Sequence, residues 1–220
     1  MNYQLVTDIS VWSVALPVAA GVGLVNRERW SVKLLVLFFA FSLLIELLAW
    51  RLGNQLGRSN IWVYNLYLIL ETPVWLVVLG GWSTTLKLKK FLLCLAALFL
   101  MVWLTWIFVG GWNVLSSEIG VARGLVLCVV AGMVLLRESQ RVAIDLFRNL
   151  KFWIASGVVL YFCLNTVLFS LWTIILNSTE SQIARMWVIH SVVNIFANVL
   201  YTIGLLCSYR NTTSLSPSSP

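Results

Sequence analysis

The chain alternates between long apolar runs and short polar breaks. A helix needs about 20 apolar residues to cross the hydrocarbon core of a bilayer, and seven runs come close to that length. These predicted spans lie near residues 9–25, 31–50, 61–82, 91–112, 119–136, 152–176 and 186–207. The pattern predicts an all-α polytopic membrane protein, with residues 1–210 as one seven-helix transmembrane domain. Residues 211–220, which are polar and rich in Ser and Pro, are expected to be a disordered tail.

Composition supports this interpretation and removes one alternative. Of the 220 residues, 60% are hydrophobic and 10% are charged, whereas a soluble domain carries about 25% charged residues. The net charge of +7 does not indicate a nucleic-acid partner, because Lys and Arg occur in small groups between apolar runs and not on one polar face. The expected surroundings are the lipid bilayer of the cell membrane.

The basic residues between the spans predict which way the bundle faces. Eleven Lys and Arg residues flank one set of span ends, and four flank the other set. The larger set is Arg27, Arg29, Lys33, Lys87, Lys89, Lys90, Arg137, Arg141, Arg148, Lys151 and Arg210, and the smaller is Arg51, Arg58, Arg123 and Arg185. Because basic residues are retained on the cytoplasmic side, the amino terminus is expected outside and the carboxyl terminus in the cytoplasm.

The third predicted span, which contains "IWVYNLYLILETPVW", carries polar residues where they are costly. Spacings of three and four place Tyr64, Tyr67 and Glu71 on one helical face, and Asn65 lies next to Tyr64. An acidic side chain near the bilayer centre costs about 2.5–3.5 kcal/mol, so Glu71 must be protonated, paired or in contact with water. Pro73 removes a backbone hydrogen bond nearby. A kink beside an acid is found at ion or substrate sites, and also in helices that bend only to pack.

The seventh predicted span contains a second polar group. In "HSVVNIFANVLY", His190, Asn194, Asn198 and Tyr201 lie within one narrow stripe of a helix, because they are separated by four, four and three residues. Such a stripe must face protein or water and not lipid. It would serve either for hydrogen bonds between helices or as a wall that handles a ligand or protons.

Three further polar residues fall at compatible depths in other predicted spans: Glu46 in the second, Arg123 in the fifth and Asn165 in the sixth. Arg123 would neutralise Glu46 or Glu71, because pairing makes a buried charge tolerable. With the two groups above, these residues make up the candidate ligand- or proton-binding site. A single histidine cannot supply the usual zinc ligands, and we expect no metal and no cofactor.

The break between the fifth and sixth spans, residues 137–151, reads "RESQRVAIDLFRNLK". Asp145 follows Arg141 by four residues and precedes Arg148 by three, so both pairs would meet on a helical face. We expect a helical extension at the cytoplasmic face of the membrane. It would act as a structural or lipid-contacting element, or as a docking surface for a cytoplasmic protein partner.

A weak internal repeat links the third and seventh spans. When "GRSNIWVYN" is aligned with "QIARMWVIH" on Trp62 and Trp187, His190 falls on Asn65 and Asn198 falls on Pro73. The match suggests that spans 1–3 and 5–7 are parallel repeats joined by span four, with a site between them. This 3+1+3 organisation is similar to that of the SWEET and PQ-loop group, although the Pro-Gln dipeptide of that group is absent from this sequence.

These features favour a small-solute or proton-coupled carrier. The alternative is a seven-helix sensor or receptor-like subunit that signals through a separate cytoplasmic partner. An acid–base enzyme that uses His190 with Glu71 or Glu46 stays open, since one imidazole and one carboxylate suffice for proton transfer, and so does a structural or assembly subunit. A retinal pigment is excluded, because the last predicted span contains no lysine for a Schiff base.

Overall fold

The computed structural model describes residues 3–25, 30–57, 59–114, 116–141, 146–171 and 180–213. Within these ranges, seven helices are long and apolar enough to cross a membrane. They are Gln4–Val22, Trp30–Gly53, Ile61–Gly81, Leu86–Gly110, Ser117–Gln140, Leu150–Ser170 and Arg185–Ser208. The predictions of an all-α fold and of a multi-pass membrane protein with seven spans are therefore confirmed.

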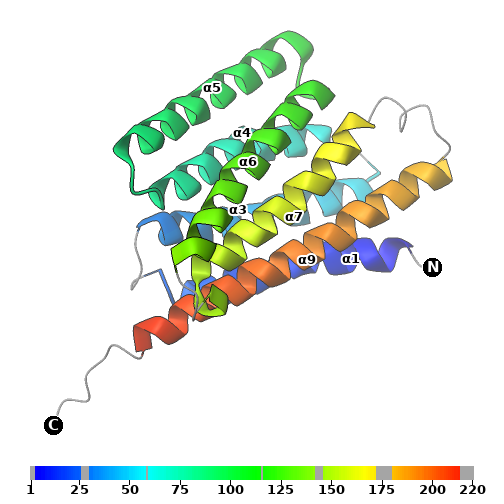
Figure 1. Cartoon of the computed structure of the whole chain (residues 1–220). Helices are drawn as coiled ribbons and strands as arrows, with labels where there is room; N and C mark the ends of the chain where they lie inside the picture. Colours follow the sequence, from blue (N-terminus) through cyan, green and yellow to red (C-terminus); the bar gives the residue numbers. More distant parts are fainter. Residues whose placement is uncertain are drawn as a thin grey trace.

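The helices, labelled as in Figure 1, follow one another up and down through the bundle. They are α1 (Tyr3–Ser13), α2 (Ala15–Val22), α3 (Trp30–Trp50), α4 (Ile61–Gly81), α5 (Leu86–Gly110), α6 (Ser117–Arg141), α7 (Leu150–Ser170) and α9 (Glu180–Thr213). Together, α1 and α2 form the first span, and a π-helical turn, Arg51–Gln55, extends α3. We call the end of the bundle at which α1, α4, α6 and α9 begin the amino-terminal end.

The first span begins earlier than predicted, because a polar residue within it has a partner. Asp8 interrupts the apolar pattern, but its carboxylate accepts a hydrogen bond of 2.8 Å from the indole Nε1 of Trp50 at the end of α3. Toward its carboxyl terminus the chain also stays helical for longer than expected. The helix α9 includes the first three residues of the predicted polar tail and ends at Thr213, and residues 214–220 lie outside the described residues.

Local residues fix several helix ends. Gly111 follows α5 with a φ of 86°, a backbone conformation that side chains disfavour, and its N–H donates to the carbonyl of Ile107. Asn149 caps α7, since its side-chain oxygen accepts from the N–H of Lys151 at 2.9 Å. The same amide donates to the carboxylate of Glu138 at 2.8 Å. These contacts join the end of α6 to the start of α7.

The extension expected within residues 137–151 is partly visible. The helix α6 continues to Arg141, and a short 3₁₀ turn, Leu146–Arg148, precedes α7. Asp145 lies outside the described residues, so its expected pairs with Arg141 and Arg148 stay a prediction, as does the docking of a cytoplasmic partner.

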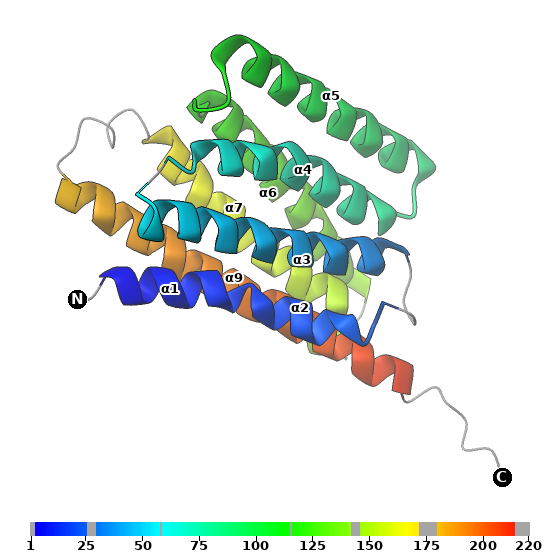
Figure 2. The same ribbon diagram turned by 180° about the vertical axis from the view of Figure 1, so that it is seen from behind.

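Six of the spans form a ring, and α5 lies outside it (Figures 1 and 2). Around the ring, α2 packs on α3, α3 on α4, α4 on α6, α6 on α7, α7 on α9, and α9 on both α1 and α2. The helix α5 packs mainly against α4. Spans 1–3 and 5–7 thus occupy the two halves of the ring. Whether these halves are repeats, and which side of the membrane each end faces, stay predictions.

Small residues allow α6 and α7 to approach closely. In "GVARG", Gly120 and Gly124 lie four residues apart on the face of α6 that meets α7. A Cβ on Gly120 would lie 2.6 Å from the ring of Phe169, and one on Gly124 would overlap the hydroxyl of Thr166. This pattern of small residues is typical of tightly packed membrane helices.

Buried apolar side chains fill much of the half of the bundle away from the amino-terminal end. Its fully buried side chains there include Leu35, Leu76, Leu79, Ile154 and Leu205. Four rings close this half off from the polar residues, and we call them the aromatic layer: Phe38, Phe39, Trp75 and Tyr201. The ring centre of Tyr201 lies 5.1 Å from that of Phe39 and 5.4 Å from that of Trp75.

Candidate functional site

A buried ion pair joins α4 to α6 beside the middle of the bundle. Glu71 is the eleventh residue of the 21-residue helix α4, and its carboxylate pairs with the guanidinium of Arg123. The two side chains are 1% and 3% exposed. The hydroxyl of Tyr67, one helical turn earlier, donates to the other carboxylate oxygen at 2.9 Å. Of the two carboxylates that Arg123 was expected to neutralise, it therefore pairs with Glu71.

Two rings from α7 also hold Arg123. Its guanidinium carbon lies 5.6 Å from the ring centre of Phe162 and 5.3 Å from that of Phe169. A cation above an aromatic face is attracted by the ring quadrupole. These rings were not identified from the sequence, because Phe residues in an apolar helix carry no signal that separates a cation contact from ordinary packing.

His190 bonds to an amide and not to a carboxylate. Its Nδ1 lies 2.8 Å from the side-chain oxygen of Asn165. The amide nitrogen of Asn165 donates to the backbone carbonyl of Tyr161 at 2.8 Å, which can only accept, so the orientation of the amide is set. Nδ1 must then carry the proton, and in the neutral ring Nε2 presents a lone pair. This geometry gives no support to an acid–base pair of His190 with Glu46 or Glu71.

The two asparagines of the α9 stripe attach the first span to α9. Asn194 donates to the hydroxyl of Ser10 at 3.0 Å, and Asn198 donates to the hydroxyl of Ser13 at 2.9 Å. The serines were missed in the sequence, since serine in an apolar helix commonly bonds to its own backbone. Hydrogen bonding between helices thus accounts for Asn194 and Asn198, whereas Tyr201 packs in the aromatic layer.

Asn65 lies apart from the other predicted site residues. It is fully buried, and its amide nitrogen donates to the carbonyl oxygens of Trp112 at 2.7 Å and Val114 at 3.1 Å. One residue of helix turns the side chain by about 100°, away from the face of Tyr64 and toward the connection between α5 and α6. The geometry assigns Asn65 to holding that connection.

Three cavities that share lining residues run inward from the amino-terminal end. The outer cavity, about 310 Å³, lies between α1, α3, α4 and α9. The middle cavity, about 90 Å³, reaches Arg123 and the rings of α7. The inner cavity, about 30 Å³, has room for about two water molecules and ends at the aromatic layer. Glu46 lines all three cavities.

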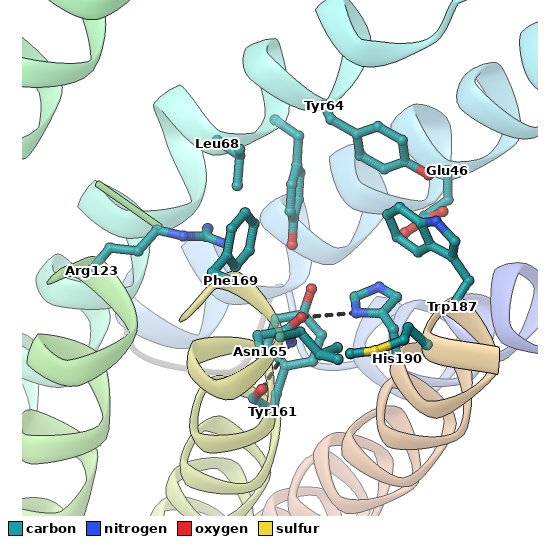
Figure 3. A pocket seen from close by; sticks show the side chains of 12 residues that line it. Glu46, Tyr64, Leu68, Arg123, Tyr161, Asn165, Phe169, Trp187 and His190 are labelled. Carbon is teal, nitrogen blue, oxygen red and sulfur yellow. Dashed lines mark hydrogen bonds between the residues drawn. The ribbon is translucent and has the colours of Figure 1, made fainter. Parts of the chain in front are cut away.

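Figure 3 shows how the side chains around the middle cavity divide into two groups. Glu46, Tyr64 and Trp187 gather on one side, with the hydroxyl of Tyr64 directed toward Glu46. Arg123 and Phe169 lie on the other side, and His190 lies next to Trp187, with ring centres 5.6 Å apart. Within the residues that the structure describes, Glu46 makes no hydrogen bond and no ion pair.

The sequence suggested some of this lining and missed the rest. Tyr161 and Trp187 both line the middle cavity. Tyr161 lies one turn before Asn165 on α7, a spacing that was available in the sequence. Trp187 begins an apolar run, a position more typical of an interfacial anchor.

The polar residues of the cavities offer two carboxylates, one guanidinium, one imidazole and several phenol groups. Carboxylates and an imidazole are proton-transfer groups, and the whole set can bind a small polar solute. No protein-family model, no curated protein and no solved structure matches this chain. Its function must therefore be inferred from the geometry of its own residues.

Proposed function

We propose that the protein is a proton-coupled carrier of a small solute, which binds in the three cavities that share Glu46. One observation carries the proposal: Glu46 lines all three cavities and has no hydrogen-bond or ion-pair partner among the described residues. An ionisable residue that faces a cavity inside a membrane is typical of solute pathways and proton relays. The volume of the outer cavity, about 310 Å³, falls at the lower end of small-molecule sites, about 300–1,000 Å³.

The two carboxylates have different roles in this proposal. Protonation of Glu71 would leave the buried charge of Arg123 without its partner, which is costly. Protonation of Glu46 breaks no ion pair within the part of the chain that the structure describes. Glu46 is therefore the residue that exchanges protons, and the Glu71–Arg123 pair is a fixed element that joins α4 to α6. When a solute and a proton compete for Glu46, the binding of one releases the other, and this reciprocity couples their movements.

A carrier also has to open the packed half of the bundle. Two irregularities in helical hydrogen bonding lie close to the aromatic layer and support such a movement. At Val14, between α1 and α2, the backbone dihedral angles stay helical, but the N–H bonds to the carbonyl of Val11, three residues earlier, and Val14 lines the inner cavity. Pro73 lies inside α4, two residues before Trp75, and cannot donate to the carbonyl of Ile69. A helix with a lost backbone hydrogen bond bends more easily at that point.

Cysteine accessibility tests the carrier without knowledge of its solute. In a background in which Cys94, Cys128, Cys163 and Cys207 are replaced by serine, single cysteines are introduced at three positions. Val11→Cys lies in the outer cavity, Leu205→Cys lies beyond the aromatic layer, and Leu127→Cys is a fully buried control on α6. Each variant, reconstituted in vesicles, is treated from one side with a membrane-impermeant thiol reagent.

A carrier alternates between two openings, so Val11→Cys reacts from the amino-terminal side and Leu205→Cys reacts from the opposite side. Leu127→Cys stays protected from both. A reactive Val11→Cys with a fully protected Leu205→Cys would contradict the carrier. Equal reaction of Leu205→Cys and Leu127→Cys would also contradict it, because the reagent would then report general loosening and not a pathway.

The second candidate is a sensor. It is favoured by the aromatic layer, whose rings contact one another between the cavities and the buried apolar core. A sensor would bind its ligand in the same cavities and signal through a protein at residues 137–151. In that case a cytoplasmic partner co-purifies with the chain, and the double charge reversal Arg141→Glu and Arg148→Glu releases it. A complex that survives the reversal would count against this candidate.

A further inference from the structure

We infer that the solute is a small organic cation of the alkylammonium class, bound between the carboxylate of Glu46 and the aromatic rings of the middle cavity. The inference rests on the proposed function for the location of the site. It adds the chemical class of the solute, for which charge, hydrogen bonding and wall chemistry provide three separate arguments.

The charge balance of the site favours a cation. Two carboxylates, Glu46 and Glu71, and one guanidinium, Arg123, lie around the middle and inner cavities. The charge of Arg123 is taken up by Glu71, and its guanidinium also contacts two rings of α7. Among the described residues of the site, an ionised Glu46 thus leaves one net negative charge. An anionic solute would have to displace Glu71 from a buried pair, whereas a monocation meets a carboxylate that has no ion-pair partner among those residues.

Two side chains of the site, Glu46 and His190, offer hydrogen-bond acceptors. The carboxylate of an ionised Glu46 can only accept. The Nε2 of His190 is also an acceptor in the neutral ring, since Asn165 fixes the proton on Nδ1. Both residues line the outer and middle cavities. Acceptors on two helices match a solute that brings N–H donors, as a protonated amine does.

The wall of the middle cavity is largely aromatic and apolar. Tyr64, Tyr161, Phe169 and Trp187 present aromatic rings there, and Leu68 and Met186 add apolar surface. Aromatic rings attract organic ammonium groups through their negative faces, and the apolar side chains suit a short alkyl tail. Hard metal cations such as Ca²⁺ or Mg²⁺ instead require several oxygen ligands together. Among its described lining residues, the middle cavity supplies one carboxylate, that of Glu46.

The exchange reaction balances in atoms and charge. With Glu46 protonated, an incoming alkylammonium displaces the proton and forms an ion pair with the carboxylate. The proton leaves through the outer cavity toward the amino-terminal end. One positive charge enters the site and one leaves, so no net charge is buried at this step, and the protein acts as a cation–proton exchanger.

Three probes with the same carbon chain test the class directly: butylammonium, butyrate and butanol, which carry a positive, a negative and no charge. Their binding is measured by isothermal titration calorimetry on the full chain in lipid nanodiscs, with empty nanodiscs subtracted. Butylammonium is expected to bind at least about tenfold more tightly than the other two, because loss of one charge-assisted hydrogen bond weakens binding by about 10–100-fold.

Glu46→Gln is expected to reduce butylammonium binding to the level of butanol, and Trp187→Leu to weaken it by about threefold or more. The matched control is Glu118→Gln, an exposed carboxylate that lines none of the cavities described above. This variant should bind as the unaltered chain does. Near-UV circular dichroism of each variant verifies that a loss of binding is not a loss of fold.

Preferred binding of butyrate would overturn the inference and make Arg123 the anchor of an anionic solute. Equal binding of all three probes would also overturn it. So would butylammonium binding that is equally tight in the unaltered chain and in Glu46→Gln. These outcomes leave the carrier untouched, because cysteine accessibility tests alternating access independently of the solute. Conversely, a permanently protected Leu205→Cys together with Glu46-dependent binding of butylammonium would refute the carrier and keep the cation site.

Discussion

The buried pair of Glu71 and Arg123 is expected to contribute several kcal/mol to the free energy of unfolding, in the sense that loss of either partner alone is costly. Both side chains are almost fully removed from the surface, at 1% and 3% exposure. Removal of one member of such a pair leaves an uncompensated buried charge and costs about 3–5 kcal/mol. Arg123→Met and Glu71→Gln are each expected to lower the free energy of unfolding by that amount. For Arg123→Met, methionine fills part of the volume against Phe162 and Phe169.

The double variant distinguishes a pair from two separate effects. With both charges gone, no buried charge is left alone, and the glutamine oxygen still accepts from Tyr67. The double variant should therefore lose only about 1–2 kcal/mol, since replacement of both partners of a buried pair is often nearly neutral. The free energy that couples the two sites in the mutant cycle is expected to be about 3 kcal/mol or more.

Reversible unfolding in mixed micelles, followed by tryptophan fluorescence, measures the four free energies of this cycle. The double variant must be more stable than either single variant. If the losses of the two single variants simply added in the double variant, Glu71 and Arg123 would not act as a pair. The assignment of Glu46 as the proton-exchanging carboxylate would then lose its basis.

Three further predictions follow from packing and hydrogen bonds. Gly124→Leu should separate α6 from α7 and lower the thermal midpoint of unfolding markedly. Gly132→Leu lies on the same helix, where an added Cβ would meet no atom within 4 Å, and should leave the midpoint nearly unchanged. Equal effects of the two variants would refute the close approach of the helices. Asn198→Leu removes the bond to Ser13 and should cost about 1–3 kcal/mol, with faster proteolysis of the first span as a second readout. Asn149→Ala removes the cap of α7 and should cost about 1 kcal/mol, measured by unfolding in micelles.

The spans could be predicted because hydropathy alone decides where a chain enters lipid. Hydropathy does not decide which helices touch, since every face of a span is apolar enough for either lipid or protein. The position of α5 outside the ring was therefore not predicted. The early start of the first span was missed for a related reason, because Asp8 is costly in an apolar helix unless a partner such as Trp50 lies beside it.

The candidate site could be predicted in part. Helical spacing placed Tyr67 and Glu71 on one face, and the structure joins them by a hydrogen bond. Spacing within one helix cannot choose between partners on other helices, so the choice of Glu71 and not Glu46 for Arg123 required the bundle. Adjacency in the sequence was also misleading for Asn65. It follows Tyr64 directly, but its side chain bonds to the connection between α5 and α6 and does not line the cavities.

The transport of an organic cation that keeps its charge tests the central claim most directly. Methylguanidinium does not lose a proton near neutral pH, as the guanidinium of arginine does not, so its movement into vesicles cannot occur as a neutral amine, and its N–H groups can donate to Glu46 and His190. Proteoliposomes with an acidic interior should accumulate radiolabelled methylguanidinium while protons leave, and dissipation of the proton gradient should stop the uptake. Glu46→Gln should abolish this exchange, and Glu118→Gln should retain it. Uptake that does not depend on the proton gradient, or that is unchanged in Glu46→Gln, would contradict cation–proton exchange through Glu46.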